Sequence, residues 1–365
     1  MPIKHIEEYR DPVLSGKILV NIQRIRKRPI RLMEVCGTHT VSIFRSGIRS
    51  MIPQNVSLLS GPGCPVCVTT QREIDAFIGL AKKDNVIITT FGDLMRVPGT
   101  NSSLQKERAE GRDIRIVYST FDALDTARKN PDKKVVFLGV GFETTAPTVA
   151  ASIVLAEKEG LDNFLVFSAH KLVPPALFAL MADPDIMIDG FILPGHVSVI
   201  IGLNAYRPLF EKYKIPCVVS GFEPADILMA LYMLARQIEQ GAPALENGYG
   251  RAVTPDGNRK AKQIMKEVYE IMDVSWRGLG MIRKSGLGIR AGFSTYDAGG
   301  ILDMEIPEPE EPAGCACGEI LTGRKVPPEC PLYQKVCTPS DPVGPCMVSS
   351  EGTCAAYYRY HGGEA

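Results

Sequence analysis

The sequence predicts an α/β protein with two similar parallel-sheet (Rossmann-like) domains and a small, loop-rich, cysteine-bearing C-terminal domain. Between residues 31 and 250, short apolar runs ending in Gly, Pro, Ser or Thr alternate with helix-like stretches, as in parallel strands joined by crossover helices. The chain also resembles itself at an offset of about 131 residues, which favours two sheets over one. Past residue 250 the alternation stops, and six of the ten cysteines follow.

The apolar runs define eight predicted strands, at residues 31–35, 56–59, 86–90, 114–118, 134–138, 164–167, 190–193 and 216–219. The internal similarity pairs residues 36–39 with 167–170, 60–64 with 193–196, and 90–92 with 221–223. We therefore expect one α/β domain at 1–130 and a second at 131–250. The remainder, 251–365, is expected to hold a helix at 260–273, a Gly-rich run, an acidic proline-rich stretch and the cysteine domain.

Composition excludes several classes of function. At 365 residues, with 45% hydrophobic and 22% charged residues, the chain suits two or three well-packed domains. Basic and acidic residues balance at 41 each, so no net charge attracts nucleic acid or an acidic membrane surface. No apolar run has bilayer length, and the N-terminus lacks the apolar core of a signal peptide. We expect a cytoplasmic protein, in which clustered cysteines are metal ligands or redox centres more often than structural disulfides.

The C-terminal cysteines follow the spacing Cys315-x-Cys317-x12-Cys330-x6-Cys337-x8-Cys346-x7-Cys354. Four thiolates suit zinc or a cubane iron–sulfur cluster. Zinc ribbons normally carry two Cys-x2-Cys knuckles, and this segment has none, so the spacing favours an iron–sulfur domain. The segment has few aliphatic residues to bury, which also indicates a metal staple. Four ligands from six leave two spare, and spacing does not identify them.

A second group of cysteines lies near the N-terminus. Cys64-Pro-Val-Cys67 has the Cys-x-x-Cys spacing of pairs that cycle between dithiol and disulfide. A zinc knuckle needs a second pair of ligands nearby, and Cys36 with His39 could supply it, so metal sharing stays open.

Cys36 follows the first predicted strand, with His39 three residues on. The two could be a nucleophile and its base, or two metal ligands. Cys217 lies in an apolar strand and is expected to be plain core. Other polar residues at predicted strand ends could line the facing side of a cleft or orient these groups: Asp93, Glu143, His170, His196 and Glu223.

Several motifs together resemble one family, that of HypD, a nickel–iron hydrogenase maturation protein. They are Cys36-Gly-Thr-His-Thr, Gly61-Pro-Gly-Cys-Pro-Val-Cys, Gly141-Phe-Glu-Thr-Thr-Ala-Pro, Pro194-Gly-His-Val-Ser, and in the tail Cys337-Thr-Pro with Met347-Val-Ser-Ser-Glu-Gly-Thr-Cys-Ala-Ala-Tyr-Tyr. The resemblance spans nearly the whole chain, and the motifs occur in the same order.

The resemblance implies a scaffold on which iron acquires one carbon monoxide and two cyanide ligands, as Fe(CN)2CO, before delivery to the hydrogenase large subunit. The implied partners are the chaperone HypC and the cyanide donor HypE, which carries cyanide as a thiocyanate. Cys36 would ligate the iron with a cysteine of HypC, and Cys64 and Cys67 would be the redox pair and further candidate iron ligands. The tail would hold a [4Fe-4S] cluster on Cys330, Cys337, Cys354 and either Cys315 or Cys317, with Cys346 spare. We hypothesise an electron path from the cluster through Cys64 and Cys67 to iron at Cys36.

Two alternatives come from other classes of protein. An iron–sulfur-dependent thiol-disulfide reductase acting on a protein partner would explain the cluster and Cys-x-x-Cys, but it gives Cys36-Gly-Thr-His39 no role. A zinc-stabilised binding module without redox work would yield a colourless protein, so the colour of an anaerobic preparation tests it.

Overall fold

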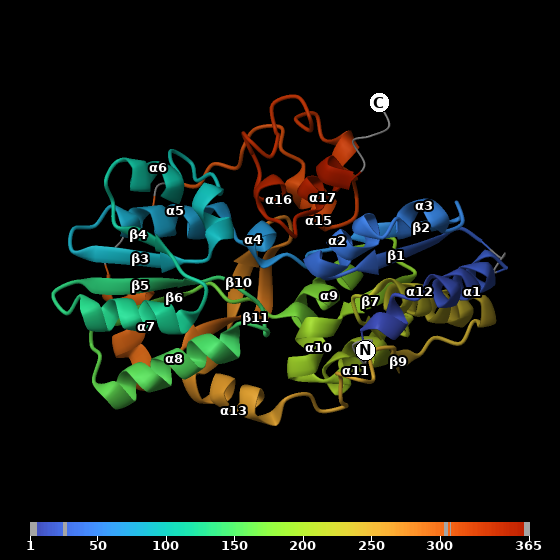
Figure 1. Ribbon diagram of the computed structural model, residues 1–365, viewed down its shortest axis with the longest axis horizontal. Helices are drawn as coiled ribbons and strands as arrows, with labels where there is room; N and C mark the ends of the chain where they lie inside the picture. Colours follow the sequence, from blue (N-terminus) through green and yellow to red (C-terminus); the bar gives the residue numbers. More distant parts are fainter. Residues whose placement is uncertain (1–5, 25–27, 303–305, 307, 361–365) are drawn as a thin grey trace.

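The computed structural model describes residues 6–24, 28–302, 306 and 308–360, and its fold is α/β (Figure 1). Two parallel sheets stand side by side, an antiparallel hairpin lies between them, and the cysteine-bearing tail packs above. This confirms the predicted fold class. Within the described ranges, no helix combines the length and apolar character that crossing a bilayer requires.

Sheet A has the strand order β2-β1-β7-β8-β9, and sheet B the order β4-β3-β5-β6. The strands of sheet A are β1 (Ile30–Glu34), β2 (Val56–Ser60), β7 (Gly190–Pro194), β8 (Cys217–Ser220) and β9 (Leu245–Asn247). Those of sheet B are β3 (Val86–Thr90), β4 (Ile114–Ile116), β5 (Lys134–Gly139) and β6 (Phe164–Ser168). All eight predicted strands are present, and β9 was not predicted.

The sheets do not follow the expected division at residue 130. The chain forms β1 and β2, builds the whole of sheet B, and then returns to sheet A with β7. Sheet B is therefore inserted within sheet A. The matching orders are β2-β1-β7-β8 and β4-β3-β5-β6, whereas the offset of about 131 residues pairs loops after β1 and β6, β2 and β7, and β3 and β8. The first and third pairs follow strands at different positions in sheets A and B, and β2 and β7 both belong to sheet A, so the similarity at this offset does not correspond to the match between the two sheets.

Helices cover both sheets and connect their strands. Around sheet A lie α1 (Pro12–Gln23), α2 (Gly37–Arg45), α3 (Ile48–Met51), α9 (Val173–Ala182), α10 (Gly195–Ile201), α11 (Arg207–Tyr213) and α12 (Pro224–Gln240). Around sheet B lie α4 (Pro65–Val68), α5 (Gln71–Ala81), α6 (Leu104–Ala109), α7 (Thr120–Lys129), α8 (Ala146–Glu159) and α13 (Arg259–Val268). The later helices are α14 (Ala298–Ile301), α15 (Cys317–Leu321), α16 (Pro345–Val348) and α17 (Thr353–Tyr360). The described residues also form five short 3-10 helices: η1 (Glu7–Tyr9), η2 (Gly92–Arg96), η3 (Leu203–Tyr206), η4 (Ala291–Tyr296) and η5 (Pro327–Glu329).

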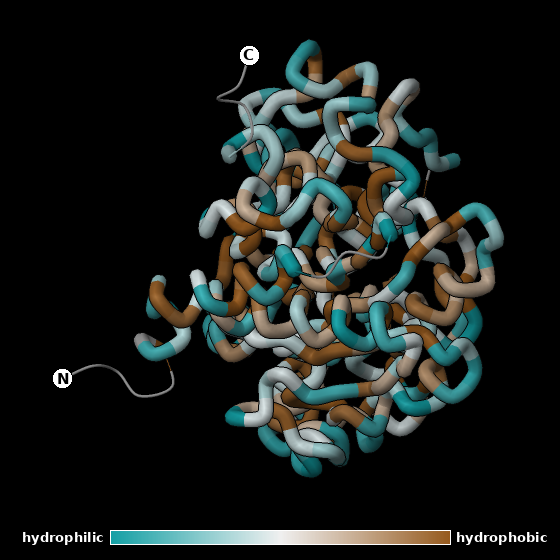
Figure 2. Tube along the Cα trace, turned by 90° about the vertical axis from the view of Figure 1, so that its right-hand side faces the viewer, coloured by the Kyte–Doolittle hydropathy of each residue, from teal (hydrophilic) through white to brown (hydrophobic). Residues whose placement is uncertain are grey.

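One buried cluster joins the parts of the molecule. Alternate strand residues point to opposite faces, so Met33 of sheet A and Val136 of sheet B both enter this cluster, while Leu32 and Val135 enter two outer ones. The tail contributes its buried cysteines to the same cluster. Figure 2 shows hydrophobic segments gathered inside and hydrophilic loops outside. The sheets and tail therefore share one core.

The antiparallel strands β10 (Tyr269–Trp276) and β11 (Gly280–Ile289) form the hairpin between the sheets. The helix predicted at 260–273 ends earlier, at Val268, because the β-prone residues from Tyr269 to Trp276 form a strand instead. At the tip Trp276 is 1% exposed, stacks on Phe142 at a ring-centroid distance of 5.9 Å, and donates from Nε1 to the Ser285 hydroxyl at 2.9 Å. The hairpin is thus built into the shared core.

We predict that Trp276→Ala lowers the free energy of unfolding by about 3–5 kcal/mol, the usual cost of emptying a buried aromatic site. Urea denaturation followed by circular dichroism measures this loss. Tryptophan fluorescence is unsuitable, because the variant removes the only tryptophan of the chain. The control Val336→Ala removes a side chain that is 55% exposed and should change stability by less than about 0.5 kcal/mol. A loss below about 1 kcal/mol for Trp276→Ala would show that the tip is not part of the core.

Candidate functional site

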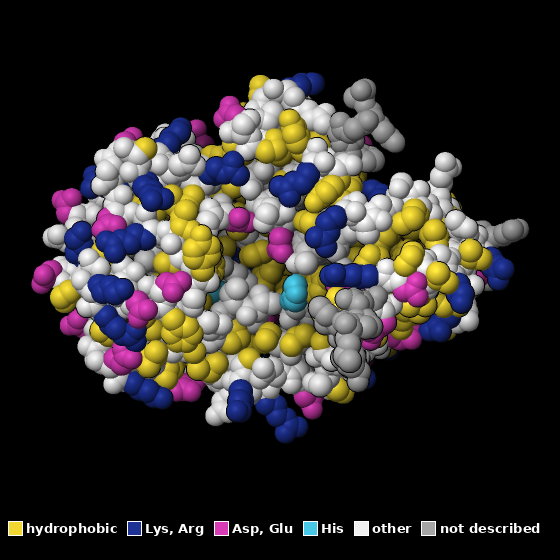
Figure 3. Space-filling view, viewed as in Figure 1, with side chains coloured by type: hydrophobic (Ala, Val, Ile, Leu, Met, Phe, Trp, Pro, Cys, Tyr) yellow, Lys and Arg dark blue, Asp and Glu magenta, His cyan; other side chains and the backbone are white. Residues whose placement is uncertain are grey.

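The candidate site lies at the carboxyl end of sheet A, where the strand order reverses. The chain goes from β1 to β2 on one side and later adds β7 on the other side of β1. In open α/β sheets ligands bind at such switch points. The register aligns Glu34 with both Ser60 and Ile192, so the loops after β1, β2 and β7 leave the sheet side by side. Figure 3 shows the surface hollowed between the two lobes, with hydrophobic side chains and a histidine in the hollow.

Cys36 follows β1 and is the N-cap residue of α2. Its side chain is 8% exposed, and its backbone N–H donates to Oε2 of Glu34 at 3.0 Å. Burial raises the pKa of the Cys36 thiol to about 12, and the carboxyls of Glu351 and Glu34 act in the same direction. Cys36 is therefore a protonated thiol at neutral pH, and a metal that binds it must displace the proton.

The loop after β2 packs directly on the Cys36 backbone. A Cβ atom at Gly63 would lie 2.1 Å from the backbone N of Cys36 and 2.3 Å from the carbonyl carbon of Val35. The Gly63 carbonyl accepts from the N–H of Gly37 at 3.0 Å, and the N–H of Gly61 donates to the Glu34 carbonyl at 2.8 Å. Only glycine permits this approach at position 63. The residue after Gly63 is Cys64, so the second group of cysteines lies beside the first.

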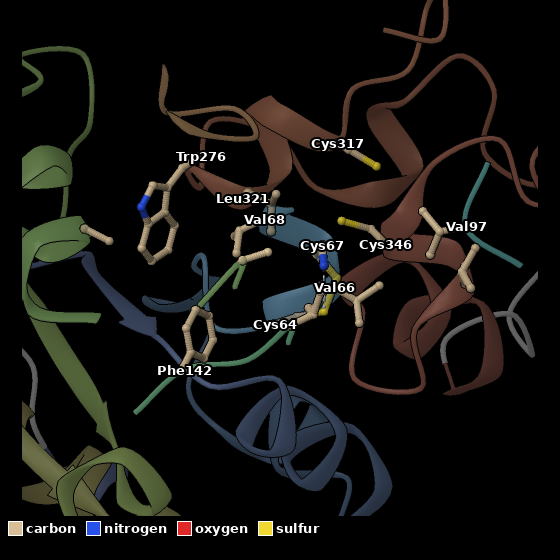
Figure 4. Close-up of a cluster of buried hydrophobic side chains, with 14 of the residues drawn as sticks. Cys64, Val66, Cys67, Val68, Val97, Phe142, Trp276, Cys317, Leu321 and Cys346 are labelled. Carbon is tan, nitrogen blue, oxygen red and sulfur yellow. Dashed lines mark hydrogen bonds between the residues drawn. A yellow bond between two sulfur atoms is a disulfide. The ribbon is translucent and has the colours of Figure 1, made fainter. Parts of the chain in front are cut away.

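Cys64 and Cys67 form a disulfide with a Cα–Cα distance of 5.2 Å. Cys64 is the N-cap of α4, and its sulfur accepts from the Cys67 N–H at 3.2 Å. The side chains are 3% and 0% exposed and belong to the shared core beside Cys317 and Cys346 (Figure 4). The pair thus makes the bond that its spacing predicts, and in this oxidised form neither sulfur is a thiolate ligand for metal.

His39 lies on α2 with its ring fully buried. Its Nε2 donates to the Gly221 carbonyl at 2.9 Å, so Nδ1 is the unprotonated nitrogen, and it has no partner. The ring stacks on Phe222 at 4.7 Å, and Phe222 stacks on His196 at 3.9 Å. Burial lowers the pKa of His39 to about 4. No hydrogen bond joins its imidazole to the Cys36 thiol, so the structure provides no nucleophile–base pair here.

Two acidic residues beside Cys36 were missed in the sequence. Glu34 is 2% exposed, accepts from the Thr40 hydroxyl as well as from Cys36 N–H, and has a pKa that burial raises to about 7. Glu351 of the tail accepts from the Thr38 hydroxyl at 2.5 Å. Glu34 could have been found from the sequence, because it is a carboxylate at the end of an apolar strand. For Glu351, which lies 313 positions from its partner, no local signal existed.

The other polar residues at strand ends have separate partners. Glu143 is buried, accepts from the Val173 N–H at 3.1 Å, and has a pKa that burial raises to about 7. Asp93 accepts from the hydroxyls of Ser349 and Ser350, both at 3.2 Å, and so anchors the tail. The remaining two are His170, whose Nδ1 lies 3.2 Å from the Ser168 hydroxyl, and Glu223, which forms a 2.6 Å ion pair with Arg10. His196, the last of the predicted cleft residues, is exposed, whereas the other described histidines, His39 and His170, are buried.

The tail brings its cysteines together. The sulfur of Cys317 interacts with those of Cys315, Cys346 and Cys354, and a Cβ atom at Gly344 would lie 2.6 Å from the Cys317 sulfur. Contact with Cys317 lowers the pKa of Cys315 to about 7. Cys337 and Cys330 lie at the margin of this group, where Cys337 accepts from Val343 N–H at 3.4 Å and Cys330 faces the Gly314 carbonyl at 3.9 Å. Cys346, expected to be spare, thus lies in the group of contacting sulfurs, beside Cys317 and Cys354.

The donor set of the tail suits a thiolate-ligated metal group. Five of its six thiols are buried, and Gly344 leaves no side chain between the sulfurs of Cys315 and Cys317. No group of three or more His, Cys, Asp or Glu side chains in the described residues already has the arrangement of a metal site. The cluster ligands therefore stay a prediction, which the thiol donors support. The positions of the sulfurs add Cys346 to the candidate ligands.

The tail also contacts the helix that Cys36 begins. Tyr357 of α17 packs edge-on against Phe44 of α2 at 4.6 Å, and the Arg49 guanidinium lies over both rings, at 5.1 and 4.9 Å. A Cβ atom at Gly37 would lie 2.5 Å from the Cβ of Glu351. The cysteine tail, the disulfide loop and Cys36 therefore form one packed unit.

Comparison with known proteins identifies the family of the chain. The HypD family, described as "Hydrogenase formation hypA family", matches residues 14–361. The hydrogenase maturation factor HypD of Rhodobacter capsulatus is 46% identical over 375 aligned positions, covering 100% of both chains. That of Azotobacter vinelandii is 45% identical, covering 98% of this chain and 97% of its own. A putative hydrogenase expression/formation protein of Methanocaldococcus jannaschii is 46% identical, covering 96% and 98%. With these matches over nearly its whole length, the chain belongs to the HypD family of hydrogenase maturation factors.

Proposed function

We propose that this maturation factor is the scaffold on which the Fe(CN)2CO group of nickel–iron hydrogenase is assembled, with iron held by Cys36. The observation that carries the proposal is the packing of Gly63 on the Cys36 backbone, which sets a disulfide beside a lone buried thiol at the switch point of sheet A. The iron is cargo, held during assembly and then passed on. HypC would supply a second cysteine ligand, HypE would supply cyanide, and the hydrogenase large subunit would receive the product.

The buried surroundings of Cys36 suit a soft metal that is shielded from water. A thiolate is a good ligand for low-spin iron, and iron binding would replace the proton that burial keeps on the thiol. Glu34 holds the backbone of Cys36, and Glu351 closes the site from the tail through Thr38. The first contact holds the Cys36 backbone, and the second ties the start of α2 to the tail.

The Cys64–Cys67 pair has the right stoichiometry for cyanide release. A thiocyanate R–S–CN that accepts two electrons and two protons yields R–SH and HCN, and two thiols that become a disulfide supply both. The dithiol form would therefore act once for each cyanide, and the structure shows the oxidised form. A [4Fe-4S] cluster on the tail cysteines would supply single electrons. The chain's own contribution is to keep Cys64 beside Cys36 and to exclude water from both.

The thiol-disulfide reductase alternative fits the site less well. Such an enzyme needs an attacking sulfur that a partner's disulfide can reach. Here Cys64 is 3% exposed and Cys67 fully buried, so a small thiocyanate-bearing segment suits the pair better than a folded protein surface. The reductase also leaves the arrangement of Cys36, Glu34 and Glu351 without a role.

The role of Cys36 gives the first prediction from the proposed function. Purified anaerobically with HypC, the wild-type protein should show infrared bands of iron-bound cyanide and carbonyl, and Cys36→Ala should lose them all. The control Cys217→Ala removes a buried thiol of β8 outside the site and should keep them. Bands that persist unchanged in Cys36→Ala would refute iron ligation by this residue.

The packing of Gly63 gives the second prediction. Gly63→Ala forces the Cys36 backbone to move, and a displacement of about 1 Å at a reacting centre can cost roughly 100-fold in rate. Hydrogenase maturation in a host lacking its own copy should fall by about that factor. Gly250→Ala is the matched control, because a Cβ atom there meets nothing within 4 Å. Maturation at the wild-type level in Gly63→Ala would mean that the contact has no role.

The redox pair gives the third prediction. Cys64→Ala should abolish maturation while the visible absorption of the tail cluster stays intact, because the tail cysteines are untouched. Maturation assays and anaerobic absorption spectra on the same preparation measure both. Normal hydrogenase maturation by this variant would show that the pair does not take part.

A further inference from the structure

The tip of the β10–β11 hairpin is inserted between the disulfide helix α4 and the tail helix α15. A Cβ atom at Gly278, which has φ +79°, would lie 2.5 Å from Cα of Gly318 in α15. The preceding Trp276 packs in the cluster that contains Val68 of α4 and Leu321 of α15 (Figure 4). The tip therefore contacts the residue after Cys67 on one side and the residue after Cys317 on the other.

Arg277 makes most of the polar contacts at this place. Although charged, it is only 4% exposed. Its backbone N–H donates to the Val68 carbonyl at 2.9 Å, and its Nε donates to the Thr69 carbonyl at 2.9 Å. Its Nη2 donates to Oε1 of Gln71 at 3.1 Å, and its Nη1 forms an ion pair with Glu311. Arg277 thus binds consecutive groups at the end of α4 and the start of α5.

Helix α4 depends on such contacts. It has four residues, Pro65–Val68, and a single turn is not stable alone. While the disulfide exists, the covalent bond fixes the turn. Once it is reduced, only non-covalent contacts keep the two sulfurs within bonding reach. The carbonyls that Arg277 binds lie one and two residues after Cys67, so they hold the end of the turn that carries this cysteine.

We propose that Arg277 is a positioning residue for the Cys64–Cys67 pair, which keeps the reduced dithiol preorganised and so favours re-formation of the disulfide. The inference rests on the proposed redox function of this pair. It assigns to a residue of the hairpin an influence on the equilibrium between the dithiol and the disulfide. Glu311 compensates the guanidinium charge, so the effect is one of geometry. Losing the contacts lowers the effective concentration of one thiol near the other, and the disulfide becomes easier to reduce.

The test uses equilibrium with dithiothreitol. One disulfide and one dithiothreitol dithiol exchange to give two protein thiols and oxidised dithiothreitol, with two electrons and two protons transferred. Full-length protein is equilibrated anaerobically across ratios of reduced to oxidised dithiothreitol. Its free thiols are then alkylated, and the state of Cys64 and Cys67 is read by peptide mass spectrometry. Circular dichroism checks the fold of each variant.

We expect Arg277→Gln to shift the equilibrium about tenfold toward the dithiol, which corresponds to about 30 mV in potential. Gln71→Leu, which removes a single acceptor, should shift it less but in the same direction, and this variant keeps the test decisive if Arg277→Gln does not fold. Arg290→Gln is the matched control, because Arg290 binds the carbonyls of Lys266 and Tyr269 at the opposite end of the same hairpin. It should leave the equilibrium at the wild-type value.

The outcomes separate this inference from the proposed function. If the wild-type pair does not cycle reversibly, the redox role fails and the inference fails with it. If it cycles in the wild type but folded Arg277→Gln and Gln71→Leu have the wild-type equilibrium constant, only the role of Arg277 is refuted. A shift toward the disulfide in Arg277→Gln would also overturn it, because it would mean that charge rather than geometry dominates.

Discussion

The whole site depends on one close contact, between Gly63 and the backbone of Cys36. Two parallel strands in register bring the loops after β1 and β2 together, and the missing side chain at Gly63 lets those loops touch. This contact decides that the disulfide of Cys64 and Cys67 lies beside Cys36. Without it the chain would carry a buried thiol and a redox pair with no geometric relation between them. Both are buried, so the chemistry proposed for them takes place away from water.

Three further elements hold this arrangement from different sides. The tail reaches the Cys36 loop through Glu351 and packs α17 on α2. The hairpin reaches the disulfide helix through Arg277. Sheet B anchors the tail through Asp93. Each contact joins parts far apart in sequence, which explains why the cysteine-bearing tail shares the core of both sheets instead of forming a separate unit on a linker. The contacts that hold the core together therefore also hold the site.

The sequence predicted the strands and the cysteine groups well, and the reasons are local. Buried parallel strands are short apolar runs bounded by turn residues, and clustered cysteines stand out by residue type and spacing. The assignment of strands to sheets could not be predicted in this way. After β6 of sheet B the chain returns to sheet A, where β7 pairs with the edge of β1 that β2 leaves free. No local sequence pattern predicts this pairing. Two charged residues with structural contacts were missed for a related reason. Glu351 and Arg277 are neutralised or hydrogen-bonded by partners 313 and 208 positions away in sequence.

In the proposed function, Cys36 holds iron next to the redox pair. The most direct measurement is an anomalous difference map, recorded at the iron edge, from crystals of the protein prepared anaerobically with HypC and loaded for maturation. We expect an iron peak bonded to the Cys36 sulfur beside the Gly63 loop, separate from any iron at the tail cysteines. An iron-loaded, maturation-competent complex with no iron at Cys36 would contradict it.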